Sequence, residues 1–333
     1  MTAIQYDEHG DVDKLILRDA PCPKPEEDEV VVRVRAAGLN GFDPMMLSGA
    51  TGLKTPFPMC PCGDFAGEIA AIGDKVSEWE IGQRVNPYPI LPVKGMMGET
   101  TPGAACEYVV VPASMLIEMP DAVSFEDAAA MPVAYGTALR MIEDRGDVKA
   151  GEKMLVLGAG GGVGVASIQF GKARGAHVIA AASGAGKLDK LMEIGADETL
   201  DTSNRDWRRD LVSRHGKPAF FGDPGGMDVI VNYVGGPTWV DSLKCLKNEG
   251  RILVCGASAG HDPQEDLRYI WSFEQSIVGS NGWSIADQVE LLKRVSEGVF
   301  KPVIHEIYPL ADTGRAFKDL ADRKIVGKAV IAI

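Results

Sequence analysis

The chain has 333 residues, 45% of them apolar, and this length exceeds what one hydrophobic core usually serves, so two domains are expected. Its 34 basic and 47 acidic residues give a formal net charge of −13, which disfavours nucleic acid and anionic membrane surfaces as partners. No apolar run is long enough to span a bilayer and no export signal is visible, so we expect a cytoplasmic protein whose six cysteines are free thiols.

The first part of the chain, residues 1–122, carries short segments of alternating polarity. Glu29–Ala36 and Tyr108–Val111 are examples, and proline and glycine separate such segments from one another. This pattern predicts a β-rich domain. Ser124 then stands where a helix N-cap is expected, and a helical pattern follows it, so the second domain is predicted to begin at residue 123.

Strands and helices alternate from residue 123 to residue 297. The predicted strands are apolar throughout, which is typical of a parallel sheet buried on both faces. We therefore predict an α/β fold in which a doubly wound, Rossmann-type domain occupies 123–297, while 298–333 returns to the first domain. The predicted strands are Lys153–Leu157, His177–Ala182, Asp228–Tyr233, Arg251–Cys255 and Ser276–Gly279, and the predicted helices are Gly162–Arg174, Gly186–Ile194 and Ile285–Val299.

A glycine-rich turn joins the first of these strands to the first of these helices. Residues without side chains let a phosphate approach the backbone, and the N–H groups at the start of a helix can bind it. The alternative is a turn that binds nothing, but its place in a strand–turn–helix unit favours a dinucleotide site. The expected cofactor-binding residues of the turn are Ala159, Gly160, Gly161, Gly162, Val163 and Gly164.

The choice of dinucleotide depends on the end of the next strand. A carboxylate there would bind the ribose 2′-hydroxyl of NAD and repel the 2′-phosphate of NADP. The chain has Ser183 at this place and Lys187 shortly after it, and a hydroxyl and an ammonium can both bind a phosphate. NADP is therefore the predicted cofactor. NAD stays possible, because Lys187 can equally be an ordinary solvated residue.

With these features in view, almost the whole chain resembles the medium-chain dehydrogenase/reductase family. The resemblance implies a GroES-like β-rich catalytic domain, interrupted in sequence by the Rossmann domain, with the active site in the cleft between them. It also implies cofactor contacts from Val234, Gly256 and Lys328. The segments that carry it, besides the glycine-rich turn, are Gly38–Asp43, Gly63–Gly67, Gly82–Val85, Ala129–Ala138, Val234–Gly236 and Val326–Lys328.

The chain departs from the zinc-dependent members of this family at all three positions of their catalytic ligands. It has Asn40 in place of a cysteine, Gly63 in place of a histidine, and Val133 in place of the third ligand. Glycine and valine offer no donor atom, and an amide is a poor zinc ligand. The cysteine cluster of their structural zinc lobe is missing as well. We therefore expect no metal site.

The family segments together with the missing zinc ligands resemble the zinc-independent quinone oxidoreductase branch. This resemblance implies an enzyme that transfers hydride from NADPH to a small apolar quinone, enone or other α,β-unsaturated carbonyl compound. The resemblance places Asn40 and Thr137 at the reacting groups. Asn40 can instead be a turn former beside Gly41, and Thr137 a hydroxyl that bonds to its own helix.

Two further readings of the function stay open. The first is a family member that binds NADPH without turnover. The second is an alcohol dehydrogenase-like or enoyl reductase activity, although the tyrosine acid of enoyl-thioester reductases is not visible between Asn40 and Pro56. A homo-oligomer, either dimer or tetramer, is also expected, because the resemblance places Ser276–Gly279 at an unpaired sheet edge.

Overall fold

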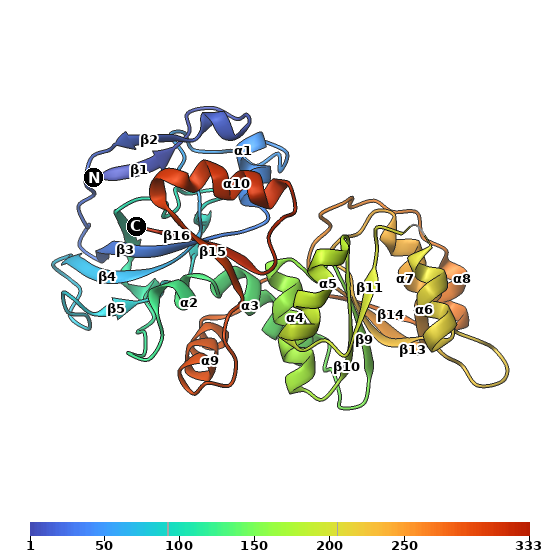
Figure 1. Ribbon diagram of the computed structural model, residues 1–333. Coiled ribbons are helices and arrows are strands. Elements are labelled where there is room, and N and C mark those ends of the chain that lie inside the picture. Colours follow the sequence, from blue (N-terminus) through green and yellow to red (C-terminus); the bar gives the residue numbers. More distant parts are fainter. Residues whose placement is uncertain (92, 205) are drawn as a thin grey trace. The chain divides into compact units, whose positions relative to one another are not determined.

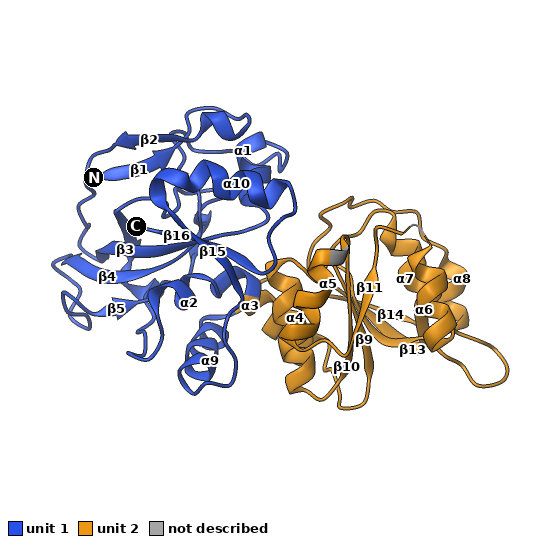
Figure 2. Cartoon of the chain, viewed as in Figure 1, with its two compact units in different colours: residues 1–134, 284–333 blue, residues 135–283 orange. Residues whose placement is uncertain are grey.

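The computed structural model describes residues 1–91, 93–204 and 206–333, and the chain forms two compact units (Figures 1 and 2). Unit 1 comprises Met1–Ala134 and Ser284–Ile333, and unit 2 comprises Tyr135–Trp283. Unit 2 is therefore shorter at both ends than the 123–297 expected for the second domain.

Two helices account for this difference. Helix α2 (Phe125–Ala129), which Ser124 caps by accepting from Asp127 N at 3.0 Å, packs on the sheet of unit 1. Helix α9 (Ile285–Ser296) also belongs to unit 1. Its Gln288 side chain is fully buried and donates to the side-chain oxygen of Asn86 at 2.8 Å. The sequence pattern predicts both as helices, but it does not show which domain they pack on, because their packing partners lie far away along the chain.

A six-stranded sheet forms the centre of unit 1, with strand order β15-β16-β3-β4-β5. Strand β8 pairs with the first half of β3, and β16 pairs antiparallel with its second half. The C-terminal segment therefore returns to unit 1, and the first residue of β16, Lys328, lies near the end of β3. The strands are β3 (Glu29–Leu39), β4 (Asp64–Ile72), β5 (Arg84–Val85), β8 (Tyr108–Pro112), β15 (Ile304–Pro309) and β16 (Lys328–Ala332).

Smaller elements surround this sheet and close its core, which contains the fully buried Phe65, Tyr308 and Phe317. Strands β1 (Thr2–Gln5) and β2 (Ile16–Asp19) form one antiparallel ribbon, and β6 (Ile90–Leu91) and β7 (Gly95–Met96) form another. The remaining elements are the helices α1 (Asp43–Ser48) and α10 (Thr313–Ala321) and the single turns η1 (Val12–Lys14), η2 (Ala113–Met115) and η4 (Leu310–Asp312).

Unit 2 is a doubly wound Rossmann domain. Its six strands are all parallel in the order β11-β10-β9-β12-β13-β14, so the chain winds outwards from β9 in both directions. Because all strands point the same way, their carboxyl ends meet at one edge. The strands are β9 (Lys153–Leu157), β10 (His177–Ala182), β11 (Glu198–Asp201), β12 (Met227–Val231), β13 (Leu246–Val254) and β14 (Ser276–Gly279).

Helices cover both faces of this sheet, as Figure 1 shows for α4 and α5 on one face and α6 to α8 on the other. The segment Arg140–Arg145 (η3) continues α3 as a π-helix. The helices are α3 (Pro132–Leu139), α4 (Gly162–Ala173), α5 (Ala185–Ile194), α6 (Trp207–His215), α7 (Thr238–Cys245) and α8 (Leu267–Ser272).

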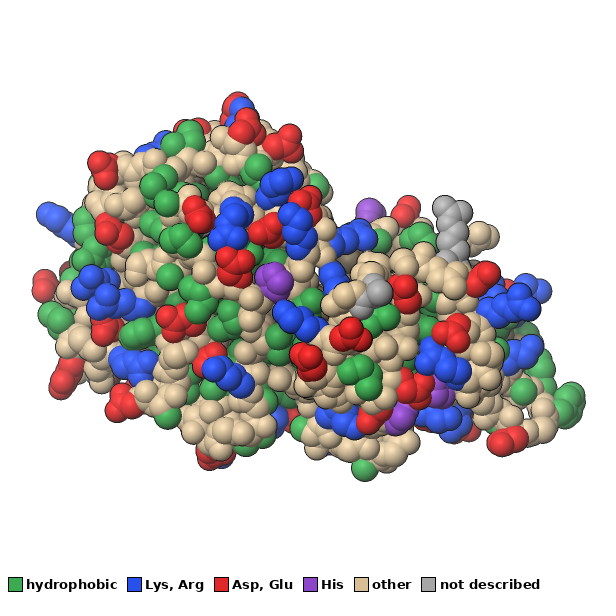
Figure 3. Space-filling view, viewed as in Figure 1, with side chains coloured by type: hydrophobic (Ala, Val, Ile, Leu, Met, Phe, Trp, Pro, Cys, Tyr) green, Lys and Arg blue, Asp and Glu red, His purple; other side chains and the backbone are tan. Residues whose placement is uncertain are grey.

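On the face shown in Figure 3, acidic and basic side chains are interspersed. Within the described part of the chain, every helix is too short or too polar to cross a bilayer.

Candidate functional site

Three side chains form a buried polar cluster in unit 1. Asn40 follows the last residue of β3, Asp64 is the first residue of β4, and Lys328 is the first residue of β16. The antiparallel pairing brings these strand ends together although 288 residues separate Asn40 from Lys328. The Lys328 ammonium donates to Asn40 Oδ1 and lies 3.3 Å from Asp64 Oδ2, and the exposed fractions of Lys328 and Asp64 are 2% and 0%. The cluster is therefore shielded from water.

The cluster fixes which way the Asn40 amide faces. An ammonium has no acceptor atom, so the atom that Lys328 contacts must be the amide oxygen. Asn40 Nδ2 then donates to Asp64 Oδ2 at 2.8 Å. A side-chain amide carries two N–H groups, so this arrangement leaves Asn40 with a second donor beyond the one bonded to Asp64.

A second carboxylate, that of Asp43, binds the backbone of Asn40. Asp43 is buried and accepts from the backbone N–H of Asn40 at 2.7 Å and from that of Cys62 at 2.9 Å. Burial raises the pKa of Asp43 to about 7, against the lowering effect of the two backbone donors and of the Lys328 charge. Burial also raises the pKa of Asp64 above its usual range, and the Lys328 ammonium is the strongest influence that opposes this rise.

Asp64 also anchors the start of α3. The backbone N–H of Val133, in the first turn of this helix, donates to Asp64 Oδ1 at 3.1 Å. A carboxylate at a helix N-terminus is stabilised by the free N–H groups there and by the helix dipole. Asp64 thus links β4, β16 and α3. Thr137 lies further along α3 in unit 2, where 9% of it is exposed.

The glycine-rich turn lies at the carboxyl edge of the parallel sheet in unit 2. Gly158 has a φ of +70°, and Gly161 is the N-cap of α4. A Cβ at Gly164 would lie 2.7 Å from the backbone of Ala159, so only glycine allows the helix to approach the strand this closely. A Cβ at Gly160 would meet only the Lys187 side chain, at 3.5 Å. The turn therefore leaves much of its backbone open to a ligand, which fits a dinucleotide pyrophosphate.

The other residues expected to bind the cofactor lie around this turn. Ser183 is exposed after β10, and Lys187 lies in the first turn of α5 with its Nζ 3.9 Å from the position of a Cβ on Gly160. The Val234 side chain reaches within 3.0 Å of such a position on Gly158. Gly256 follows the end of β13, and a Cβ there would lie 3.8 Å from Tyr233. The remaining expected cofactor residue, Lys328, belongs to unit 1, where it bonds to Asn40 and Asp64.

Comparisons with known proteins assign the chain to a family. Residues 26–121 match the family described as alcohol dehydrogenase GroES-like domain, and residues 162–297 match the one described as zinc-binding dehydrogenase. Quinone oxidoreductase of Mus musculus is 30% identical over 328 residues, which cover 96% of this chain and 94% of that protein. The chain belongs to the medium-chain dehydrogenase/reductase superfamily, in its quinone oxidoreductase-like branch.

Solved structures agree with this assignment. A structure described as an NAD-dependent alcohol dehydrogenase is 32% identical to this oxidoreductase, with a TM-score of 0.91 and full coverage of both chains. The 2-octenoyl-CoA carboxylase reductase CinF, in complex with NADP and 2-octenoyl-CoA, is 25% identical with a TM-score of 0.84, over 99% of this chain and 87% of that one. The GroES-like and Rossmann folds expected from the sequence are therefore confirmed.

The description of one matched family raises the question of zinc, and the residues of this oxidoreductase do not fit a catalytic zinc ion. Both ends of the Asn40 amide are bonded to Lys328 and Asp64. A Cβ at Gly63 would lie 2.4 Å from the carbonyl oxygen of Met97, so no ligand side chain fits at this position. Among the described residues, no group of three or more His, Cys, Asp or Glu is placed to hold a metal.

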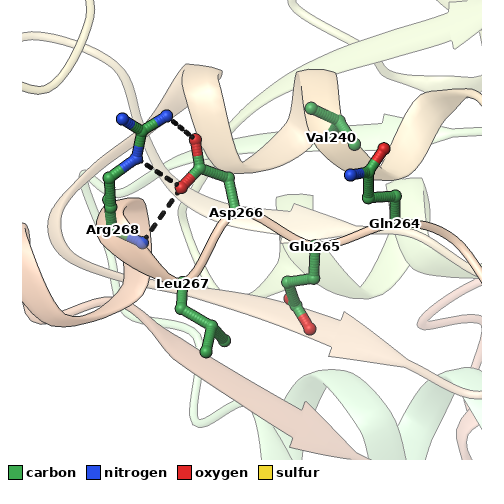
Figure 4. Close-up of a pocket in the computed structure, with 6 residues that line it drawn as sticks. All are labelled: Val240, Gln264, Glu265, Asp266, Leu267 and Arg268. Carbon is green, nitrogen blue, oxygen red and sulfur yellow. Dashed lines mark hydrogen bonds and ion pairs between the residues drawn. The ribbon is translucent and has the colours of Figure 1, made fainter.

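A surface hollow of about 480 Å³ lies beside α7 and α8 and contains none of the expected site residues (Figure 4). The guanidinium of Arg268 is turned to Asp266, with Nη2 2.8 Å from Oδ2, and is not free to bind an anion. Glu265 and Asp266 would repel a phosphate. This hollow is therefore a poor candidate for the dinucleotide site.

Sequence reasoning missed three parts of the site. It did not connect Lys328 with Asn40, it gave Asp43 no role, and it overlooked Tyr233, whose hydroxyl donates to Gly158 O at 2.5 Å. The Tyr233 contact could have been found, because a residue two positions beyond β12 lies opposite the turn that follows the neighbouring strand β9. The Lys328 contact requires the strand pairing of the folded chain.

Proposed function

We propose that this chain is an NADPH-dependent oxidoreductase that transfers hydride to a quinone, an enone or another α,β-unsaturated carbonyl compound without a metal. The observation that carries the proposal is the buried cluster of Asn40, Asp64 and Lys328, which puts an oriented amide donor at the position where zinc-dependent relatives have a ligand. An alcohol dehydrogenase, the alternative within this family, would need a metal to stabilise the alkoxide form of its substrate.

The cluster suits the reduction of a conjugated carbonyl group. Nicotinamide supplies the hydride in such reactions. Negative charge then develops on the carbonyl oxygen of the substrate, where the second N–H of Asn40 can donate, and a proton from solvent completes the reduced product. The positive charge of Lys328 beside Asn40 Oδ1 polarises the amide and strengthens this donor. We propose that Thr137 packs against the nicotinamide.

The residues around the glycine-rich turn would hold the dinucleotide. Ala159 to Gly164 would bind the pyrophosphate, Ser183 and Lys187 the 2′-phosphate, and Val234 and Gly256 the nicotinamide half. Relatives differ in cofactor, since one neighbour is described as NAD-dependent and another is in complex with NADP. The absence of a carboxylate at Ser183 favours NADP here.

Six free thiols support a reducing compartment such as the cytoplasm.

A steady-state screen tests the proposed reaction. Oxidation of NADPH and of NADH would be followed with panels of quinones, enones, enals, an enoyl thioester and saturated aldehydes. We expect turnover of the conjugated acceptors, faster with NADPH, and little turnover of the saturated aldehydes. Binding of NADPH without turnover of any acceptor would instead identify a non-catalytic family member.

Metal content gives a second, independent test. We expect the purified protein to contain no stoichiometric zinc, because Asn40, Gly63 and Val133 do not supply the ligands that zinc requires. Elemental analysis would measure it, and turnover should be unaffected by a chelator. One tightly bound zinc ion per chain would contradict the metal-free part of the proposal while leaving hydride transfer itself intact.

We also propose that the chain forms homo-oligomers through the edge strand β14. This strand ends the sheet order, its Ile277 is 42% exposed, and Trp271 on the preceding helix is 72% exposed. An unpaired apolar edge is commonly covered by a second copy. Light scattering at micromolar concentration should give a mass of at least twice 35.5 kDa, and Ile277→Lys should shift it towards the monomer. A wild-type mass of 35.5 kDa alone would contradict this proposal.

A further inference from the structure

Helix α4 begins without a side-chain cap. Its N-cap is Gly161, which has no side chain and therefore cannot accept a hydrogen bond from the first turn. Val165 N donates to Gly161 O at 2.9 Å and closes that turn. The N–H groups of Gly162, Val163 and Gly164 consequently have no acceptor within the helix. What satisfies them decides what this helix end can bind.

Tyr233 reaches this helix end from a neighbouring strand. Strands β9 and β12 are parallel, with Val231 beside Val156, and the same register continued by two residues places Tyr233 beside Gly158. The phenol hydroxyl donates to Gly158 O at 2.5 Å. A Cβ at Gly161 would lie 3.2 Å from the phenol oxygen. The phenol therefore lies against the inner side of the glycine-rich turn, in space that glycines leave open.

The phenol oxygen also faces the backbone N–H of Gly164, at the start of the helix. Burial raises the pKa of Tyr233 well above its usual range, and a hydrogen bond from the Gly164 N–H partly opposes this rise. A hydroxyl that stays protonated can donate to Gly158 O and accept from Gly164 N–H at the same time. Tyr233 thus faces one of the three N–H groups at the start of α4, that of Gly164, and leaves those of Gly162 and Val163 for an anion.

The backbone around Tyr233 is held firmly. Asn232 is fully buried, and its side chain donates to Ser242 Oγ at 2.9 Å. Its Oδ1 accepts from the N–H groups of Val234 at 3.1 Å and Gly235 at 2.9 Å. The segment that carries the phenol is therefore fixed on both sides, which favours a permanent brace over a side chain that swings out of the turn.

We propose that Tyr233 is a positioning residue for the dinucleotide, which braces the glycine-rich turn in the shape where the N–H groups of Gly162 and Val163 face the pyrophosphate. This proposal rests on the proposed function. The phenol acts through the turn and does not touch the reacting atoms, so it sets the affinity for the pyrophosphate-containing ligand and not the rate of hydride transfer.

Tyr233→Phe tests the brace by removing one oxygen atom. Calorimetric titration of the full chain would compare NADPH and ADP-ribose, which contain the pyrophosphate, with 2′-AMP, which lacks it. We expect affinity for the first two to fall by about 5- to 50-fold, the range for a lost hydrogen bond that leaves buried partners unsatisfied, and affinity for 2′-AMP to stay within about 2-fold. The KM for NADPH should rise, while kcat at saturating NADPH should be retained.

Tyr269→Phe is the matched control. It makes the same chemical change in the same unit, on α8, where the ring packs on Phe273 at 5.7 Å between centroids. It should leave all three affinities unchanged. Thermal unfolding of each variant without ligand separates a loss of stability from a loss of affinity.

Several results would overturn the brace. Equal weakening of 2′-AMP and NADPH, or a lower melting temperature with unchanged affinities, would make Tyr233 a purely structural residue. Tighter binding of NADPH would show that the phenol obstructs the turn. A wild-type chain that binds neither NADPH nor NADH would instead contradict the proposed function as well, so the two failures are distinguishable.

Hydrogen exchange of the wild-type chain tests the same geometry without any variant. In the free chain the amide of Gly164 should be protected, whereas those of Gly162 and Val163 should exchange freely and become protected only when NADPH is added. A Gly164 amide that exchanges as fast as its two neighbours in the free chain would overturn the proposal.

Discussion

Replacing Lys328 with methionine is expected to lower the free energy of unfolding by about 3–5 kcal/mol, the usual cost of removing one partner of a buried ion pair. The substitution leaves the fully buried Asp64 carboxylate without its cation. The loss should grow as pH rises. Without the ammonium the pKa of Asp64 in the folded chain rises further, and a raised carboxyl pKa stabilises the fold only at pH values low enough for protonation. Urea unfolding at several pH values measures both effects.

A second substitution provides the control. Asp64→Asn in the Lys328→Met chain removes the unpaired charge and should recover part of the lost stability, although it should not restore turnover, because Asn40 would still lack its cation. In folded Lys328→Met samples we expect kcat for enone reduction to fall with little change in NADPH affinity. A variant that loses NADPH affinity and keeps kcat would instead support the predicted role of Lys328 in cofactor binding.

Ser183→Asp is expected to weaken NADPH binding by about 5- to 150-fold, corresponding to about 1–3 kcal/mol for an unfavourable contact with a charged group. The new carboxylate would stand at the end of β10, where it repels the 2′-phosphate and can accept from the ribose hydroxyls of NADH. NADH binding should therefore survive or improve. Titration of both dinucleotides gives the ratio of affinities.

Two further variants sharpen this test. Lys187→Ala should weaken the binding of NADPH selectively, but less severely than Ser183→Asp does. The attraction between a partly solvated ammonium and the 2′-phosphate contributes less affinity than a direct charge repulsion would remove. Ser213→Asp, which adds the same charge on the exposed surface of α6, should leave the ratio unchanged. Wild-type protein that binds NADH more tightly than NADPH would contradict our interpretation of this turn.

The sequence by itself determined the features that depend on neighbouring residues. The apolar runs of β9 and β10 have the predicted bounds, and β14 does too, because a run of apolar or β-branched residues between turn formers has few alternatives. The glycine-rich turn was predicted for the same reason: strand, turn and helix follow one another within about a dozen residues. Ser124 was recognised as a helix cap because the bond is local: its hydroxyl oxygen accepts from the N–H of Asp127, only three residues further along the chain.

Only the tertiary structure decided the features that depend on distant residues. Lys328 meets Asn40 because β16 pairs antiparallel with β3, and no local pattern near residue 328 contains that register. The bounds of unit 1 likewise depend on Gln288 reaching Asn86, 202 residues away. Burial of Asp43 shifts its pKa only once strand ends and loops enclose it. The chemistry of a buried charge is a property of what surrounds it, and in this protein the surroundings come from both ends of the chain.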